Sequence, residues 1–334
     1  MKPEVLALFD EKLKHEAAAR FSLEPESLKM LDGFENVVLE ASRNGTPYIL
    51  RISHGSHRTV DQIHAELDWL DYLSSHGLSV CTPLRSKNGD LVESVGNDHG
   101  QFIAVCFEKA AGGLVRRDDW TRETTLNRGK LLGRMHALTR QYRSPSDQIK
   151  RYNWYDEDDF ISYRKYLPSA DTVVADRFAE LQQALRAIPT DNDSYGLIHM
   201  DAHTGNMFFD GDRPTLFDFD DCAYDFFISD IAISLFYAVL MFPPERDREA
   251  FGRDFLNTML EGYRSEYKLD NRWLEVIPMI LKRRELVLYV AIHRGFDSDN
   301  FDDWCRRYLD GRKEKIDKRV PYLDLDWSEF DLSN

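Results

Sequence analysis

The hydrophobic pattern of this chain changes once, near the paired glycines at positions 112 and 113, and this change constrains the fold more than any other feature. Before it, short apolar runs separated by turn-forming residues are typical of strands. After it, apolar residues recur mainly at three- and four-residue intervals, which is typical of amphipathic helices. The sequence therefore predicts an α+β fold, with a small strand-rich part followed by a larger, mainly helical part.

The strand-rich part begins with a predicted hairpin, because turn-forming residues 43–47 separate two β-prone runs. A helix is predicted next, since apolar residues between 63 and 73 follow helical spacing and a His-Gly stop signal comes after them. The expected strands are 37–41, 48–52, 91–95 and 102–107. Together these elements predict a small α+β lobe.

The remaining chain contains helical patterns with one strand-rich interruption at 197–219. The expected helices are 126–138, 160–166, 174–188, 231–240, 251–263 and 273–292. A chain of 334 residues is longer than the roughly 250–300 residues at which single cores stop growing. We therefore expect two lobes, residues 1–108 and residues 109–334.

The chain is acidic, with a formal net charge of -15 at pH 7. Such a charge repels nucleic acids and anionic membranes, so neither is expected as a partner. The negative charge suits a cationic ligand. The alternative is that the chain is simply acidic, as many cytoplasmic proteins are. The N-terminus does not resemble a signal peptide, no apolar run reaches the ~18 residues of a membrane span, and the four cysteines form no C-x-x-C motif. A cytoplasmic location with reduced thiols is expected.

The most informative segment is 197–230. Short apolar runs at 207–209 and 215–217 flank turn-forming residues 210–214, which predicts a hairpin. On an antiparallel ladder this places Asn206 opposite Asp218, with Cβ atoms roughly 4.5–5.5 Å apart. An amide oxygen and a carboxylate so placed suit Mg²⁺, which prefers oxygen ligands and binds substrate phosphates as well.

Asp201 lies five residues before Asn206 and enters the same hairpin. Its carboxylate is placed to orient an attacking hydroxyl or accept its proton, and His199 is placed to brace the loop. Phosphoryl transfer needs little more than alignment and cations that hold the phosphates. The alternative is an acidic surface turn, but the H-x-D-x-x-x-x-N spacing and the D-F-D return strand occur together and favour the functional interpretation.

A second pair of charges lies in the first part of the chain. Arg51 interrupts an apolar strand, and Glu66 lies near the apolar face of the predicted helix. A carboxylate near a core is unfavourable unless it is paired. We expect an Arg51–Glu66 pair that directs the cation at nucleotide phosphates; the alternative is two unrelated, solvated charges.

The stretches HMDAHTGN at 199–206 and FDFDD at 217–221 resemble the catalytic loop and metal-binding segment of aminoglycoside phosphotransferase-like and choline kinase-like small-molecule kinases. The resemblance implies a bilobal, protein kinase-like fold. Residues 1–108 would be the nucleotide-binding N-lobe with an antiparallel sheet. Residues 109–334 would be the mainly helical C-lobe with the catalytic loop, metal site and acceptor pocket.

The resemblance also implies roles for single residues. Asp201, with His199, would be catalytic; Asn206 and Asp218 would bind Mg²⁺; Arg51 would take the place of the phosphate-binding lysine and Glu66 that of its partner; and Asp230 would brace the catalytic loop. The main chain of Glu108 and Ala110 would bind adenine. The phosphate loop at 31–36 has the single glycine Gly33, which departs from the G-x-G-x-x-G pattern of protein kinases.

Only about a dozen residues separate Asp218 from the helix expected near Asp230. Protein kinases place a peptide-binding activation segment there. We therefore expect a phosphotransferase that moves the γ-phosphate of Mg-ATP to a hydroxyl of a small molecule: an amino alcohol, an amino sugar or a hydroxylated amino acid such as homoserine. The aromatic and acidic residues at 152–159 are placed to hold an amine, or form a solvated helix start. The alternatives are an atypical bacterial Ser/Thr protein kinase and a non-catalytic nucleotide-binding protein.

Overall fold

The computed structural model describes residues 3–31, 33, 35–97, 100–116, 120–146, 150–243 and 245–333. The chain forms two compact units, each built from three segments. The first unit comprises Met1–Gly113, Tyr142–Arg151 and Thr215–Asp220, and the second comprises Leu114–Gln141, Tyr152–Pro214 and Asp221–Asn334. The functional lobe boundary after residue 108 stays a prediction.

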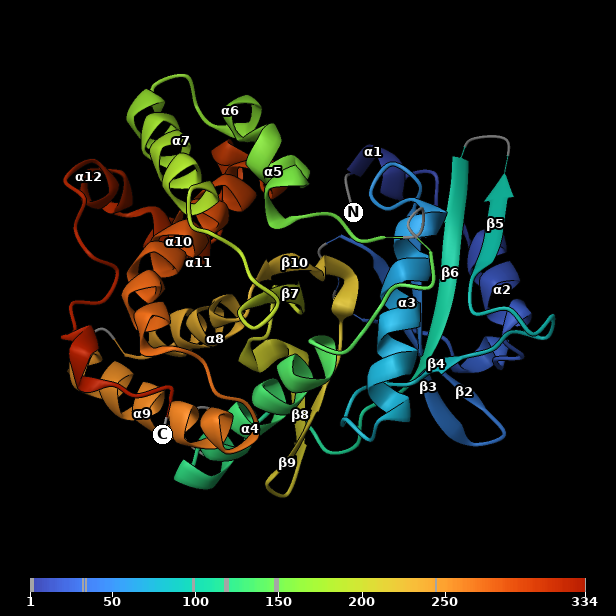
Figure 1. The fold of residues 1–334 in the computed structure, drawn as a ribbon. Coiled ribbons are helices and arrows are strands. Elements are labelled where there is room, and N and C mark those ends of the chain that lie inside the picture. Colours follow the sequence, from blue (N-terminus) through green and yellow to red (C-terminus); the bar gives the residue numbers. More distant parts are fainter. Residues whose placement is uncertain are drawn as a thin grey trace. The chain divides into compact units, whose positions relative to one another are not determined.

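The first unit is organised around an antiparallel sheet (Figure 1). Its strands are β1 (Lys29–Leu31), β2 (Val37–Arg43), β3 (Thr46–His54), β4 (Pro83–Leu84), β5 (Glu93–Asn97) and β6 (Gly100–Glu108). The order is β1-β2-β3-β6-β4, and β5 also pairs with β6. The hairpin β2–β3 turns through Asn44 and Gly45, which both have positive φ. Two such residues form the tight turn that matches strand twist, so the predicted hairpin is confirmed with a shorter turn.

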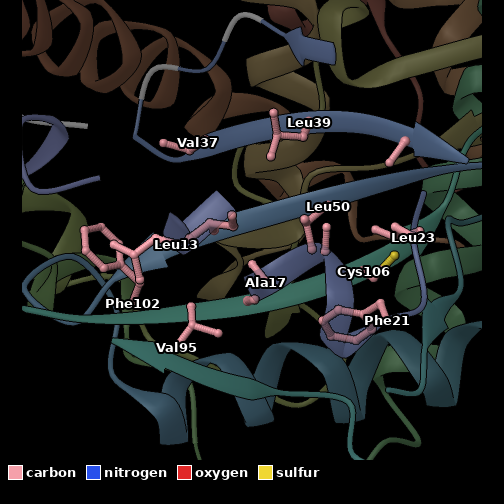
Figure 2. Close-up of a cluster of buried hydrophobic side chains, with 14 residues drawn as sticks. Leu13, Ala17, Phe21, Leu23, Val37, Leu39, Leu50, Val95, Phe102 and Cys106 are labelled. Carbon is pink, nitrogen blue, oxygen red and sulfur yellow. The ribbon is translucent and has the colours of Figure 1, made fainter. Parts of the chain in front are cut away.

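Both faces of this sheet are covered. Alternate side chains of β6 point to opposite sides, and each set packs in a separate cluster. Phe102 and Cys106 join the core on the face where α2 (Glu11–Arg20) packs, and Figure 2 shows its residues Leu13 and Ala17 in this cluster. Ile103 and Val105 face the other way and pack against Ile63 and Leu67. These two residues belong to α3 (Val60–Ser75), whose first turn carries a capping box between Thr59 and Gln62.

Two later segments complete the first unit. Leu216 forms a parallel bridge with Val80. The ring of Phe219 lies 5.4 Å from that of Trp69 on α3. Tyr142 donates a hydrogen bond to Asp68 over 2.7 Å. The unit therefore depends on residues that are far apart in the sequence.

The second unit is mainly helical. Its helices are α4 (Arg122–Thr139), α5 (Asp158–Ile161), α6 (Tyr163–Tyr166), α7 (Thr172–Arg186), α8 (Ile228–Leu240), α9 (Arg248–Glu266), α10 (Ile277–Gly295), α11 (Asp303–Leu309) and α12 (Arg312–Asp317). All six helical patterns of the sequence coincide with helices. The pattern at 160–166 covers two short helices, and the one at 273–292 begins in the 3-10 segment Asn271–Val276 before α10.

Four short strands interrupt the helices. β7 (Tyr195–Ile198) pairs with β10 (Ala223–Phe226), and β8 (Met207–Asp210) pairs with β9 (Arg213–Leu216). The β8–β9 turn is the two residues Gly211 and Asp212, not the five expected. Asn206 lies in a 3-10 turn before β8, and Asp218 lies beyond β9 with φ 63°. The expected position of these two residues on the strand ladder is therefore wrong.

The antiparallel sheet near the N-terminus and the helical remainder confirm the predicted α+β class. All four cysteines are buried free thiols. Among the described residues, no helix combines the length and the apolar character needed to cross a membrane.

Candidate active site

The loop that carries Asp201 follows β7 and is held by Asp230 of α8. The two Asp230 oxygens accept hydrogen bonds from the main-chain N–H groups of His199 (3.0 Å) and Met200 (2.9 Å). His136 of α4 lies 3.3 Å from the same carboxylate. Met200 has φ 67°, an uncommon conformation for a residue with a side chain. These charge-assisted bonds stabilise the bend, so Asp230 has the bracing position that the resemblance implied.

Donors approach both carboxylate oxygens of Asp201. Asn206 Nδ2 donates to Oδ2 over 3.0 Å and to the main-chain oxygen over 3.1 Å. His203 Nε2 lies 3.2 Å from Oδ2, and its Nδ1 accepts from Gly205 N–H, which leaves the proton on Nε2. Arg284 Nη2 of α10 donates to Oδ1. The structure thus brings Asp201 and Asn206 together and places His203 and Arg284 beside the same carboxylate.

The charge of Asp201 follows from these neighbours. Burial raises the pKa of this carboxyl, but its neighbours His203 and Arg284 lower it more, so the net shift is well below the usual range. Asp201 is therefore a carboxylate at neutral pH. His199 is fully buried, and its Nδ1 accepts the Asp201 N–H over 3.2 Å, which suits a bracing role.

Asn206 belongs to the second unit and Asp218 to the first, so their joint binding of a divalent metal ion such as Mg²⁺ stays a prediction, although their oxygen donors suit such an ion. Because Asn206 Nδ2 is used by Asp201, the amide oxygen is the atom left to bind a cation. Asp218 carries an exposed carboxylate after β9. In the described ranges, no group of three or more His, Cys, Asp or Glu residues could hold a metal. A site with few protein oxygens suits Mg²⁺, which also binds phosphates and water.

The expected Arg51–Glu66 pair is confirmed. Arg51 of β3 donates from Nη1 to Oε1 (2.8 Å) and from Nη2 to Oε2 (2.7 Å) of Glu66 on α3, and both side chains are buried. Burial lowers the pKa of Arg51, but the charges of Glu66 and Asp220 outweigh it and raise the pKa. The role of this guanidinium in phosphate binding stays a prediction.

Sequence reasoning missed Asp220, which is buried within the first unit. His57 Nε2 lies 2.7 Å from Oδ2, and Arg51 Nη1 lies 3.8 Å from Oδ1. Arg58 and Arg151 both donate to the main-chain oxygen of Asp220. Burial raises the pKa of Asp220, yet the Arg58 and His57 charges lower it well below the usual range. This cluster fixes the end of the FDFDD segment, and no local pattern links residues so distant in sequence.

The three other residues expected at the nucleotide, Gly33, Glu108 and Ala110, have simpler surroundings. A Cβ on Gly33 would lie 2.4 Å from the main-chain oxygen of Asn36, so the loop requires glycine there. Asp32 and Phe34 of the same loop lie outside the described residues. Glu108 N–H donates to Thr82 O over 2.9 Å, which holds the end of β6, and Ala110 follows it in a half-buried position. Their adenine contacts stay a prediction.

The acidic and aromatic stretch at 152–159 is engaged in internal contacts. Trp154 is buried, and the Arg283 guanidinium lies 4.7 Å from its ring centroid. Asp159 lies 3.2 Å from Arg294. Asp158 and Asp159 open α5, where negative charge is favourable. These contacts favour the helix-start interpretation over the amine-binding one.

Arg284 and Tyr237 were also missed by sequence reasoning. Arg284 follows Lys282 and Arg283 in a helix that is mainly apolar, and three adjacent cations there were the available signal. Tyr237 on α8 accepts from Arg284 over 2.6 Å. Only the packing of α8 and α10 shows that one of the three cations meets Asp201.

Residues 29–269 match the profile of APH, the phosphotransferase enzyme family. The chain belongs to this family. This confirms the predicted family and enzyme class, a phosphotransferase of the kinase type.

Known kinases are similar over almost the whole chain. Amicoumacin kinase from Bacillus subtilis (strain 168) is 36% identical over 322 residues, which cover 96% of this chain and 95% of the relative. The structure of amicoumacin kinase hAmiN in complex with AMP-PNP, Ca²⁺ and Ami has 36% identity and a TM-score of 0.93, covering 98% of this chain and 99% of that one. The microcompartment-associated aminopropanol kinase has a TM-score of 0.76 at 20% identity, covering 93% of this chain and 98% of that one, and shows the shared fold alone.

Proposed function

We propose that this phosphotransferase moves the γ-phosphoryl group of Mg-ATP to a hydroxyl of a hydroxylated small molecule of the amicoumacin type. The observation that carries the proposal is Asp201, whose two carboxylate oxygens are held by donors beside the amide of Asn206. The 36% identity to an amicoumacin kinase over nearly the full length supports the acceptor class.

Asp201 orients the acceptor hydroxyl and takes its proton. Its lowered pKa makes it a weak base, which agrees with a loose phosphoryl-transfer transition state. In such a transition state the attacking oxygen keeps its proton until late, so alignment matters more than base strength. The residues around Asp201 are therefore suited to fix its direction.

Asn206 Oδ1 and Asp218 would hold Mg²⁺, and Arg51 would hold a nucleotide phosphate. The metal supplies positive charge that neutralises the phosphates and the charge developing during transfer. The loop at Gly33 would cover the phosphates, and the main chain of Glu108 and Ala110 would bind adenine. The known complex of the 36% identical kinase contains AMP-PNP and Ca²⁺, which supports this assignment of nucleotide and divalent ion.

A protein acceptor is not favoured by the chain that follows Asp218. Only the 3-10 turn Phe219–Asp221 and the strand β10 lie between it and α8. This leaves no room for the activation segment on which protein kinases bind peptide.

The test is an ATP-consumption screen of amicoumacin, choline, ethanolamine, homoserine and aminoglycosides, with product mass measured for each. We expect Mg-dependent transfer to an amicoumacin-type hydroxyl. Asp201→Asn should lower kcat by about 10²–10⁴-fold and leave Mg-ATP binding intact.

Asp210→Asn is the matched control, because this exposed residue ends β8 away from the Asp201 contacts. Its kcat should equal that of the wild type. Transfer to serine of a protein mixture with none to small molecules, or full turnover by Asp201→Asn, would contradict the proposal.

A further inference from the structure

We propose that Arg284 is a positioning residue for phosphoryl transfer, holding the carboxylate of Asp201 in the orientation that the acceptor hydroxyl requires. The inference rests on the proposed function, because it assigns a role in the same reaction. It concerns a residue on α10, more than eighty positions from the catalytic loop.

The first observation is the place of the guanidinium. Arg284 Nη2 donates to Asp201 Oδ1 and to the hydroxyl of Tyr237, the latter over 2.6 Å. The guanidinium carbon also lies 4.9 Å from the Tyr237 ring centroid. Tyr237 on α8 thereby holds the guanidinium of Arg284 on α10 in a fixed position next to the Asp201 carboxylate.

The second observation is that the other oxygen of Asp201 is held separately. Oδ2 accepts from Asn206 Nδ2 over 3.0 Å and lies 3.2 Å from His203 Nε2. A carboxylate anchored at one oxygen can rotate about its Cβ–Cγ bond, but one anchored at both cannot. Oδ1, which accepts from Arg284, has two lone-pair sites, so capacity remains on this oxygen for the acceptor hydroxyl.

The third observation is that burying the Arg284 side chain is unfavourable for the free energy of folding, so packing alone does not explain this residue. Within the described residues, its Nε is buried and has no hydrogen-bond partner. A buried polar atom without a partner costs about 1–3 kcal/mol, and buried ion pairs are often replaced by apolar residues without loss of stability. A cation at this position is better explained by what it does to Asp201.

The molecule contains a closely matched arginine without this contact. Arg312 Nη1 lies 2.7 Å from Glu285 Oε1, and its guanidinium carbon lies 4.5 Å from the ring centroid of Tyr308. It is about as exposed as Arg284, with 14% against 17% of the side-chain surface. Arg312 therefore has a carboxylate partner and a tyrosine ring contact like those of Arg284, but its carboxylate partner is Glu285 instead of Asp201.

The experiment compares Arg284→Met, Arg284→Lys and Arg312→Met in the full-length enzyme, with kcat and KM measured for ATP and acceptor. Arg284→Met should lower kcat about 10²-fold, the size expected when a reacting group is misplaced by about 1 Å. KM for ATP should not change, because the lost contact acts in the transition state. Arg284→Lys should recover part of kcat, since an ammonium can still donate to Asp201.

Arg312→Met should lower the melting temperature as Arg284→Met does but keep the wild-type kcat. Tyr237→Phe keeps the ring and removes the hydroxyl, so it should fold and reduce kcat less than Arg284→Met. If Arg284→Met does not fold, the kcat values of Arg284→Lys and Tyr237→Phe test the positioning role in its place.

The possible failures are distinguishable. If Asp201→Asn is inactive while Arg284→Met keeps the wild-type kcat, the positioning role is wrong and the proposed function stands. A loss of stability with unchanged kcat would likewise show Arg284 to be structural. If the wild type transfers phosphate to none of the small molecules, the proposed function and this inference are both overturned.

Discussion

At the scale of single residues, the charges of the segments that we propose to be catalytic are buried and paired. Asp230 and Glu66 are fully buried, and Asp220 is nearly so. An unpaired buried charge is strongly destabilising, so each of these carboxylates is held by N–H groups or cations within its own unit. The consequence is rigidity at the places where phosphoryl transfer requires alignment.

The Arg51–Glu66 pair gives a test of this view. Glu66→Leu leaves Arg51 buried without its hydrogen-bonded partner and with Asp220 3.8 Å away, so we expect a loss of about 3–5 kcal/mol in the free energy of unfolding. The double variant with Arg51→Met should recover much of this loss, because no unpaired charge remains. Urea denaturation measures both.

The half-exposed pair between Glu40 and Lys109 is the control, with a distance of 2.7 Å. Glu40→Gln should change stability by no more than about 1 kcal/mol, as is usual for surface pairs. Equal losses for Glu66→Leu and Glu40→Gln would show that burial does not govern the Arg51–Glu66 contact.

At the scale of elements, the second unit depends on a very close crossing of α4 and α9. A Cβ on Gly129 of α4 would lie 2.0 Å from the main-chain oxygen of Met259, and one on Gly262 of α9 would lie 2.0 Å from that of Leu126. Backbone atoms cannot rotate away as side chains do. Glycine therefore has a packing role here, although it weakens an isolated helix.

Gly129→Ala should accordingly destabilise the protein by about 1–3 kcal/mol or more through overpacking. The gain in helix propensity of about 1 kcal/mol does not compensate, because the two helices must move apart. Thermal unfolding by circular dichroism measures the change. Gly252→Ala in α9 is the control, because its Cβ would meet the side chain of Leu323 at 2.7 Å, and this side chain can adjust. A Gly129→Ala variant as stable as the wild type would contradict the close crossing.

At the scale of the whole molecule, the two units are interleaved along the chain. The first unit takes Tyr142–Arg151 and Thr215–Asp220 from the part of the sequence that otherwise builds the second. Phe219 packs on Trp69, and Arg151 Nη1 donates to Gln62 O over 3.2 Å. The unit is therefore incomplete when the chain is cut after residue 113.

We expect the fragment 1–113 to lack a cooperative unfolding transition in urea, followed by far-ultraviolet circular dichroism. The missing segments leave apolar surface of α3 and the carboxylate of Asp68 without the contacts they have in the full chain. The full-length protein, unfolded under the same conditions, is the reference. A cooperative transition of the fragment at the full-length midpoint would show that the two later segments contribute nothing to the unit.

Much of the fold and part of the site could be predicted because they depend on short-range pattern. Strand and helix periodicity located the sheet and the helices, and the placing of Glu66 near an apolar face led to its pair with Arg51. The spacing of Asp201 and Asn206 lies within one loop, where a five-residue separation nearly fixes the contact. The strand-ladder argument for Asn206 and Asp218 failed because it assumed a turn of five residues instead of two.

The sequence by itself therefore determined the order of strands and helices and the internal contacts of the loop that we propose to be catalytic, since both depend on residues close together along the chain. The tertiary structure alone decided which cation meets which carboxylate: Arg284 rather than Arg283 at Asp201, and His57 at Asp220. The physical reason is that local periodicity sets which face of an element is buried. The partner on that face depends on how distant elements pack.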